Sequence, residues 1–196
     1  MKYYAVRIGR LPGIYENWPD CEAQVKGFKN AEYKSFTTRD AAEEYMAAKN
    51  ETDITGYVYP LAFIDGSFNP ETKIYGYGGF LSVSQSESHD LTGCDCDPEM
   101  TSMRNIAGEI MGAIAAIDKA IDLGLKSLTI YYDYMGIEKW ATGEWKRNKS
   151  GTKKYYETVQ TAKTKISLKF VHVDAHTGIP GNELADKMAK KAVGLI

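Results

Sequence analysis

Apolar segments that end near an acidic residue recur along residues 57–196, and helical segments separate them. "YVYPLAFIDGSF" is a predicted strand ending in Asp-Gly-Ser, while "SLTIYYD" and "LKFVHVD" are predicted strands ending at Asp133 and Asp174. "IYGYGGFLSV" adds a strand rich in glycine and tyrosine. Isoleucines at helical spacing predict a long helix over 104–123, and "YMGIEKWA", "KYYETVQTAKTK" and the last segment are further predicted helices. This alternation predicts a mixed sheet with helices packed on it.

Four acids stand out in this pattern. Open α/β sheets bind ligands at the carboxyl ends of strands, where Asp65, Asp133 and Asp174 are expected. Glu109 lies on the long helix beside Gly108, among small residues that would let the helix approach the sheet closely. Any one of these acids alone is more often a solvated surface residue. Four of them together, close to a histidine, indicate a functional site.

The expected chemistry is that of hard cations. Carboxylates that share a site repel one another and stay ionised when a cation compensates them. Oxygen ligands suit Mg²⁺ or Mn²⁺, and two such ions can activate water and stabilise the leaving oxygen of a phosphodiester. The last helix adds Glu183 and Asp186 on one face. We interpret Asp186 as a ligand, Glu183 as its helper, and His176 on the preceding turn as a group that moves a proton or eases product release.

Charge and composition narrow the class of protein. A net charge of −2 argues against a simple basic nucleic-acid coater. Residues 51–103 hold one base, Lys73, against many acids, whereas the chain is basic from "KRNKSGTKK" onward. We expect a cytoplasmic protein, because no segment has the apolar character of a membrane span or secretory signal and three cysteines fit a reducing compartment. Cys94 and Cys96 in "GCDCDP" are predicted to lie in a polar loop without metal.

Residues 1–48 form a separate predicted unit. Strand, helix, strand and helix follow one another, with "AEYKSF" as the second strand and a helix that starts at a capping threonine in "TTRDAAEEYMAAK". The polar stretch that includes "NETDIT" is a predicted linker. The predicted organisation is therefore a small domain over 1–48, a linker over 49–56 and a larger domain over 57–196.

The motifs "IDGSF", "RNIAGEI", "YYDYMGIEKW" and "DAHTGIPGNELADKMA" resemble type 1 ribonuclease H in order and spacing, over about residues 57–196. The resemblance implies an α/β ribonuclease H-like fold, a five-stranded mixed sheet flanked by helices. It also implies two Mg²⁺ ions, with Mn²⁺ as an expected substitute, and matches His176 to a mobile histidine of the family. By matching motifs, the four metal-binding acids are Asp65, Glu109, Asp133 and Asp186.

The same resemblance implies substrate contacts. Asn105 matches an asparagine that contacts the RNA strand, and Gly66 and Ser67 match an Asp-Gly-Ser turn near the RNA backbone. Trp140 and Trp145 resemble the aromatic side of a channel for the DNA strand, with core packing as the alternative. Two departures stand out. Arg104 replaces a common small hydroxyl residue, and the long basic helix of some members is missing, which leaves a loop with Lys146, Arg147, Lys149, Lys153 and Lys154.

The first 48 residues resemble the small α+β hybrid-binding domain, also called viroplasmin-like, that often precedes this enzyme. The resemblance rests on "YYAVRIGRLPGIY", the tryptophan at 18, "QVKGF" and "AEYKSF". It implies that Trp18 and Tyr33 bind the nucleic acid, with Trp18 stacking on the DNA strand, and that Lys34 meets phosphate. Core packing is the alternative for Trp18. Ser35 departs from the family, where a second lysine is common.

Together these features predict an endonuclease that cuts the RNA strand of RNA–DNA hybrids and leaves 3′-hydroxyl and 5′-phosphate ends. We expect a monomer without membrane contact, with double-stranded RNA as a second ligand of the small domain. Asn105 and the backbone near Ser67 would recognise the 2′-hydroxyl that DNA lacks. One alternative is a non-catalytic protein that binds hybrids or double-stranded RNA. Another is a different nuclease or a strand-transfer enzyme on the same fold.

Overall fold

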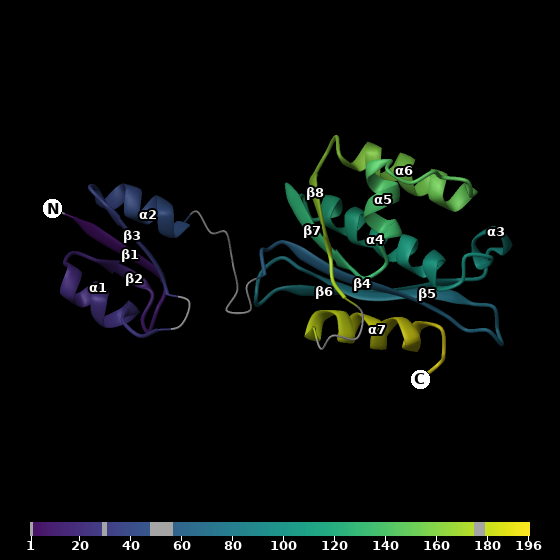
Figure 1. The fold of residues 1–196 in the computed structure, drawn as a ribbon, viewed down its shortest axis with the longest axis horizontal. Helices are drawn as coiled ribbons and strands as arrows, with labels where there is room; N and C mark the ends of the chain where they lie inside the picture. Colours follow the sequence, from purple (N-terminus) through teal and green to yellow (C-terminus); the bar gives the residue numbers. More distant parts are fainter. Residues whose placement is uncertain (1, 29–30, 48–56, 175–178) are drawn as a thin grey trace. The chain divides into compact units, whose positions relative to one another are not determined.

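The structure, a computed structural model, describes residues 2–28, 31–47, 57–174 and 179–196. It divides into two compact units, Met1–Thr52 and Asp53–Ile196, which are described separately (Figure 1). The predicted linker over 49–56 lies outside the described residues, and so does the predicted turn residue His176. Among the described helices, none has both the length and the apolar character that crossing a bilayer requires.

The N-terminal unit is a three-stranded antiparallel sheet with two helices. Strand β1 (Tyr3–Ile8) lies between β2 (Gly13–Tyr15) and β3 (Glu32–Phe36). Asn17 caps helix α1 (Trp18–Val25) by accepting a 3.0 Å hydrogen bond from the Asp20 backbone. Helix α2 (Arg39–Ala47) follows Thr38, whose hydroxyl accepts from Ala41 at 3.3 Å, so the predicted capping threonine is confirmed. The short strand β2 was not predicted.

The C-terminal unit contains a five-stranded mixed sheet in the order β6-β5-β4-β7-β8. Strands β4, β5 and β6 are antiparallel, whereas β4, β7 and β8 are parallel. The elements in chain order are β4 (Leu61–Phe68), β5 (Tyr75–Ser82), β6 (Ser88–Asp95), α3 (Pro98–Thr101), α4 (Asn105–Asp122), β7 (Ser127–Tyr132), α5 (Gly136–Thr142), α6 (Ser150–Ala162), β8 (Ser167–His172) and α7 (Pro180–Ala192).

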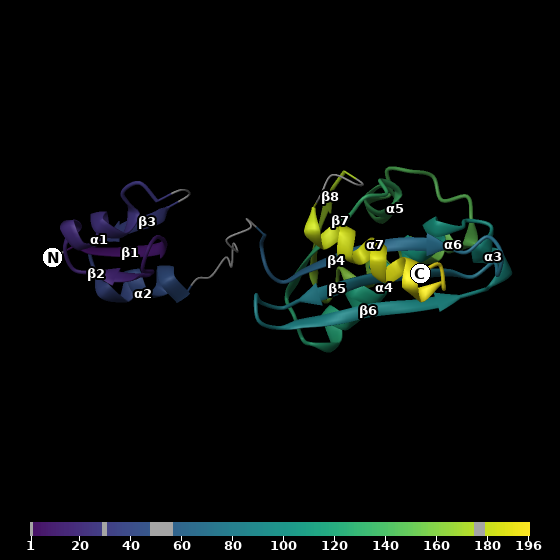
Figure 2. The same cartoon turned by 90° about the horizontal axis from the view of Figure 1, so that it is seen from below.

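Helices cover both faces of this sheet. Figures 1 and 2 show α4, α5 and α6 on one face and α7 on the other. The larger core forms under α4, where Ile110 and Ile117 pack against sheet residues such as Ile64 and Ile130. The smaller core lies under the start of α7 and contains Leu61, Phe63, Tyr131, Val173 and Ala185. The predicted fold class is therefore confirmed, including the small α+β unit that precedes the mixed sheet.

Four details differ from the prediction. The Asp-Gly-Ser motif does not form the expected turn, because β4 continues through it to Phe68 and β5 pairs with β4 along its whole length. Strand β6 was not predicted, and Cys94 lies in it and not in a loop, although both Cys94 and Cys96 are exposed and free. The short helix α3 was also missed. Helix α6 starts at Ser150 and not at Lys154, the first residue of the predicted helix, so Lys153 of the predicted basic loop is helical.

Candidate active site

Asp65 lies where two parallel strands part. β4 and β7 are paired only from Leu61 to Phe63, opposite Thr129 to Tyr131. Beyond this point the strands no longer bond to each other, and Asp65 on β4 and Asp133 after β7 stand at the opening. Asp65 is 8% exposed, so its carboxylate is largely shielded from water. The Asp-Gly-Ser sequence is thus part of a strand and not the predicted turn.

Glu109 reaches the same point from α4. A Cβ atom on Gly108 would overlap the backbone carbonyl oxygen of Gly76, so glycine permits the close approach of helix and sheet. Glu109 is 1% exposed, and its Oε1 accepts a 3.1 Å hydrogen bond from the Gly66 backbone. Its other oxygen, Oε2, is buried without a hydrogen-bond partner among the described residues. The small residues around Glu109 therefore place an acid under the sheet, as predicted.

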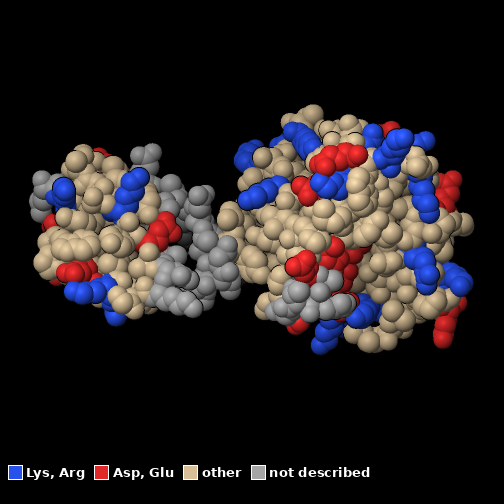
Figure 3. All heavy atoms as spheres, viewed as in Figure 1, with Lys and Arg blue, Asp and Glu red and all other residues tan. Residues whose placement is uncertain are grey.

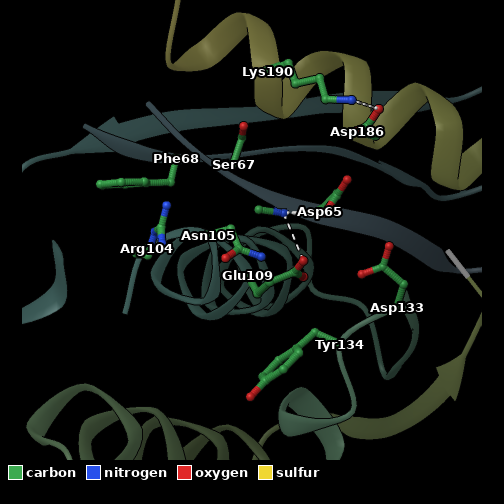
Figure 4. A pocket seen from close by; sticks show the side chains of 11 residues that line it. Asp65, Ser67, Phe68, Arg104, Asn105, Glu109, Asp133, Tyr134, Asp186 and Lys190 are labelled. Carbon is green, nitrogen blue, oxygen red and sulfur yellow. Dashed lines mark hydrogen bonds and ion pairs between the residues drawn. The ribbon is translucent and has the colours of Figure 1, made fainter. Parts of the chain in front are cut away.

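Asp133 completes a compact group of three acids. One carboxylate oxygen each from Asp65, Glu109 and Asp133 can be chosen so that all three lie within 4.8 Å of one another. The side-chain amide of Asn182 donates to Asp133 Oδ2 at 3.3 Å, and the His172 ring lies 3.0 Å from the Asp133 backbone carbonyl. Figure 4 shows the carboxylates of Glu109 and Asp133 directed towards the same space near Asp65.

Two of the three acids, Asp65 and Glu109, are electrostatically strained. Burial, with a further contribution from Asp133, raises the pKa of Asp65 to about 6, although the Gly66 backbone bond opposes the shift. Burial, followed by the charge of Asp65, raises the pKa of Glu109 well above its ordinary value. Burial and mutual repulsion both disfavour the ionised carboxylates. A divalent cation would offset both effects, since it would replace the lost hydration and balance the negative charges. The buried, unpartnered Glu109 Oε2 is an oxygen that such a cation could bind, so these residues fit a hard metal ion.

Asp186 lines the same pocket from α7 but stands outside the group of three. Its Oδ2 lies 2.7 Å from Nζ of Lys190, one helical turn further on (Figure 4). The pocket has a volume of about 560 Å³ and is lined by Asp65, Gly66, Ser67, Phe68, Arg104, Asn105, Glu109, Asp133, Tyr134, Asp186 and Lys190. Glu183, the predicted helper of Asp186, is exposed and does not line the pocket.

One rim of the pocket combines a positively charged side chain, Arg104, with the polar side chain of Asn105. Asn105 is the first residue of α4, and Arg104 precedes it with a backbone φ of +56°. The Arg104 guanidinium lies 5.4 Å from the centroid of the Phe68 ring. No ion pair of Arg104 is found among the described residues, so its charge is available to a ligand. On the face of the C-terminal unit shown in Figure 3, acidic side chains form several separate groups, one of them near the centre, and basic side chains stand between and around them.

The predicted tryptophans occupy different environments. Trp140 on α5 is 9% exposed and belongs to the larger core, whereas Trp145 is 41% exposed. Their ring centroids are 5.9 Å apart, and Tyr134, which lines the pocket, lies 5.7 Å from Trp140. The alternative of core packing therefore describes Trp140 well, while Tyr134 and Trp145 are the accessible members of this aromatic row.

In the N-terminal unit, Trp18 and Tyr33 are exposed and come together. Their ring centroids are 5.7 Å apart, with Tyr4 behind Trp18 at 5.6 Å. Successive strand residues point to opposite faces, so Lys34 does not join this pair. Its Nζ lies 5.7 Å from the Phe36 ring centroid, with Tyr45 at 6.0 Å. The predicted binding residues of this unit are thus divided between two faces.

Sequence reasoning missed Phe68, Tyr134, Asn182 and Lys190 at the site. Phe68 directly follows the Asp-Gly-Ser motif, and Lys190 stands four residues after Asp186, which is the spacing of a helical ion pair. Both could have been found from spacing alone. Tyr134 directly follows Asp133, and Asn182 stands four residues before Asp186, so spacing places both near the site as well. Spacing does not show that Tyr134 lines the pocket or that Asn182 bonds to Asp133, because these contacts depend on how α5 and α7 pack.

Comparison with known proteins agrees with this architecture. Residues 59–194 match the family model described as RNase H, and residues 2–46 match the model described as Ribonuclease H1 N-terminal domain. The chain therefore belongs to the ribonuclease H family. Membership of this family makes it a hydrolase that cleaves RNA, which agrees with the resemblance noted in its sequence.

Individual relatives cover one or both units. Human ribonuclease H1 is 24% identical over 257 residues, which include 96% of this chain and 88% of the human protein. A ribonuclease H of Francisella philomiragia is 30% identical and covers 68% of this chain and 90% of its own length. A ribonuclease H of Crithidia fasciculata is 50% identical over 46 residues, or 24% of this chain and 9% of that protein.

Two solved structures share the fold of the C-terminal unit. The crystal structure of RNase H1 from Halobacterium salinarum has a TM-score of 0.57 at 21% identity and covers 69% of this chain and 98% of its own. LC11-RNase H1, solved in complex with an RNA/DNA hybrid, has a TM-score of 0.53 at 16% identity and covers 68% of this chain and 98% of its own. At these identities the likeness concerns the fold alone.

Proposed function

We propose that the chain is an endonuclease that hydrolyses the RNA strand of RNA–DNA hybrids with two Mg²⁺ ions, leaving 3′-hydroxyl and 5′-phosphate ends. The observation that carries this proposal is the group of Asp65, Glu109 and Asp133, in which one carboxylate oxygen from each residue can be chosen within 4.8 Å of the others. Glu109 Oε2 is in addition buried without a hydrogen-bond partner among the described residues. Family membership and the hybrid bound to LC11-RNase H1 support the choice of substrate.

The chain's own residues would divide the work. Asp65, Glu109, Asp133 and Asp186 would hold the ions, for which Mn²⁺ is an expected substitute. When bound, the ions would promote deprotonation of the attacking water and stabilise the leaving oxygen. Lys190 neutralises Asp186 before loading, as their 2.7 Å contact indicates. We assign His176, which lies outside the described residues, the task of moving a proton or easing product release.

Selection of the hybrid would come from the two sides of the pocket. On one side, Asn105 and the backbone of Gly66 and Ser67 would form hydrogen bonds to ribose 2′-hydroxyls, which DNA lacks. Arg104, which forms no ion pair with another described residue and lies over the Phe68 ring, would contact a backbone phosphate. On the other side, Tyr134 and the exposed Trp145 would contact the DNA strand, with Trp140 supporting them from the core. All these contacts go to the backbone or sugars, so cleavage should tolerate many sequences.

The N-terminal unit would add affinity. Trp18 and Tyr33 form an exposed aromatic pair of the kind on which nucleic acids stack. Lys34 would contact phosphate from the other face of β3. Double-stranded RNA is a second proposed ligand of this unit. We also propose that the protein acts as a monomer in the cytoplasm. The candidate metal ligands all come from one chain, which supports a monomer. The three cysteines form no disulfide, which fits a reducing compartment.

A substrate panel tests this proposal. The full-length chain would be incubated with Mg²⁺ and an end-labelled RNA–DNA hybrid, duplex DNA, duplex RNA or single-stranded RNA, and the product ends would be mapped. We expect cuts within the RNA of the hybrid alone, with ligatable 3′-hydroxyl ends, and no cuts in EDTA. Binding of the hybrid without cleavage in either Mg²⁺ or Mn²⁺ would favour the non-catalytic binding protein, and cleavage of duplex DNA would favour another nuclease.

A further inference from the structure

Asn182 is a buried polar residue at the edge of the acidic site. It is the third residue of α7 and is 5% exposed. Its Nδ2 atom donates a 3.3 Å hydrogen bond to Oδ2 of Asp133, which follows β7 and lies 49 residues earlier in the chain. The bond therefore links α7 directly to one of the three clustered acids, although Asn182 itself is not among the pocket-lining residues.

Packing fixes the position of Asn182. A Cβ atom on the preceding Gly181 would come within 2.6 Å of the Phe63 ring, so the first turn of α7 is seated against that ring. Phe63 stacks in turn on Tyr131, with ring centroids 4.6 Å apart. Tyr131 belongs to β7, the strand that leads to Asp133. The distance between Asn182 and Asp133 is thus set through Phe63 of β4, whose ring contacts both the start of α7 and Tyr131 of β7.

The amide of Asn182 is only half satisfied. Its Oδ1 is buried and has no hydrogen-bond partner among the described residues. Turning the amide over would set Oδ1 against the Asp133 carboxylate, and two acceptors facing each other would repel. A buried polar atom left without a partner is costly, and an apolar side chain of similar size would avoid that cost. The hydrogen bond to Asp133 is therefore what an asparagine provides at this position and an apolar residue would not.

Asp133 is restrained at two separate atoms. The His172 ring lies 3.0 Å from its backbone carbonyl, and since a carbonyl oxygen can only accept, Nε2 of His172 carries the proton. This contact holds the main chain and leaves the side chain free to rotate. Among the described residues, Asn182 supplies the hydrogen bond to the Asp133 carboxylate itself. The direction of the carboxylate thus depends on Asn182.

We propose that Asn182 is a positioning residue that aims the Asp133 carboxylate at Asp65 and Glu109, so that the three acids bind a divalent cation without rearrangement. The inference rests on the proposed function, because it concerns the same cation site. Groups that orient metal ligands typically affect metal affinity or activity by about 10- to 100-fold. Loss of the amide should therefore weaken cation binding more than it weakens the fold.

Two variants and a matched control test this role in the full-length chain. Asn182→Ala removes the amide, and Asn182→Leu replaces it with an apolar group of similar size. Asn69→Ala removes another buried asparagine, whose Nδ2 donates to the Val193 carbonyl at 3.0 Å. Mg²⁺ would be titrated into each metal-free protein by calorimetry. Melting temperature in EDTA, KM for the hybrid and kcat as a function of Mg²⁺ concentration would be measured alongside.

We expect both Asn182 variants to bind Mg²⁺ at least about tenfold more weakly, with kcat largely recovered at high Mg²⁺ and KM for the hybrid unchanged. Asn69→Ala should keep wild-type Mg²⁺ affinity. The inference is wrong if Asn182→Leu binds Mg²⁺ as tightly as the wild type, or if both Asn182 variants fail to fold in EDTA, since that would make the role structural. If either contradicting result is obtained while the wild type still cuts the hybrid, only the role of Asn182 is wrong and the proposed function stands. If the wild type neither binds Mg²⁺ nor cuts, the proposed function fails with it.

Discussion

The backbone N–H of Gly66 donates a 3.1 Å hydrogen bond to Oε1 of Glu109, and so joins the middle of β4 to the first turns of α4. The same N–H lies 2.7 Å from Oδ1 of Asp65. A Cβ atom at Gly66 would overlap the Asn105 carbonyl oxygen and the Glu109 backbone nitrogen. The absence of a side chain at Gly66 therefore determines how closely two acids from different elements can approach.

Replacing Gly66 with alanine should push α4 away from β4. We expect Gly66→Ala to lower the free energy of unfolding by about 1–3 kcal/mol, the usual cost of overpacking. Hybrid cleavage should fall by about 100-fold, because small displacements of catalytic groups have effects of that size. Urea titration and initial cleavage rates measure the two effects. Gly13→Ala is a suitable control, since its Cβ would meet nothing closer than 3.8 Å. Normal stability and activity of Gly66→Ala would contradict this prediction.

The raised pKa of Asp65 predicts how stability depends on pH without metal. The folded protein holds this proton up to a pKa of about 6, whereas the unfolded chain releases it near 3.8. The folded state therefore binds more protons between these values, and the free energy of unfolding should fall as pH rises from about 4 to about 7. Raising the pKa of Asp65 from 3.8 to about 6 corresponds to about 3 kcal/mol of unfolding free energy for this group.

Asp65→Asn removes that titration. The metal-free variant should be more stable than the wild type at pH 7–8, should show a flatter stability profile and should lose hybrid cleavage. Denaturant unfolding in EDTA at a series of pH values measures this. Asp122→Asn, which changes an exposed acid at the end of α4, should follow the wild-type profile. An increase in the wild-type free energy of unfolding as pH rises from about 4 to about 7 would contradict this prediction.

The ion pair between Lys190 and Asp186 should oppose metal binding. Because Lys190 already neutralises Asp186, an incoming cation must compete with it. Both side chains are partly exposed, so the pair is worth about 1 kcal/mol or less. Lys190→Met should therefore lower the Mg²⁺ concentration for half-maximal cleavage by up to about fivefold. Lys191→Met makes the same charge change on the exposed side of α7. Equal Mg²⁺ dependence in the two variants would rule out a specific effect of Lys190.

The two faces of the N-terminal sheet should contribute unequally to hybrid binding. Trp18→Ala removes one member of the exposed aromatic pair, and loss of one stacking contact costs about 1–3 kcal/mol. Lys34→Ala, on the opposite face of β3, should weaken binding less and mainly reduce its salt dependence. Fluorescence anisotropy with a labelled hybrid, in a protein inactivated by Asp65→Asn, measures both. A larger loss for Lys34→Ala than for Trp18→Ala would place the binding surface on the other face.

Much of the fold could be predicted because its buried elements carry strong patterns. The isoleucine stripe predicted α4 to within one residue at each end, and apolar runs predicted β4, β7 and β8. Strand β6 was missed because it is an edge strand with mostly exposed, polar residues, so "SHDLTGCD" shows no apolar alternation. The extended conformation of Asp-Gly-Ser, which was expected to be a turn, was missed because it depends on pairing with β5 and not on the local sequence.

The acids of the site were predictable from the sequence, but the residues that position them were not. Asp65, Glu109 and Asp133 stand beside strand ends or small helix residues, and the structure brings them together as expected. The pairing of Asn182 with Asp133 depends on how Gly181 seats α7 on Phe63, which no local pattern encodes. Burial of Trp140 beside an exposed Trp145 likewise depends on how α5 packs. The local sequence indicates which acids can bind a metal ion, whereas tertiary packing decides which neighbouring residues orient those acids.

Cleavage of a labelled RNA–DNA hybrid in Mg²⁺ by the wild type, Asp133→Asn and the surface control Asp122→Asn tests the central claim most directly. The account predicts that the wild type and Asp122→Asn cut the RNA strand, that EDTA stops them, and that Asp133→Asn binds the hybrid but cuts at least about 10³-fold more slowly, since it alters a charge in a preorganised site. Undiminished cutting by Asp133→Asn, or cutting by the wild type in EDTA, would contradict the account.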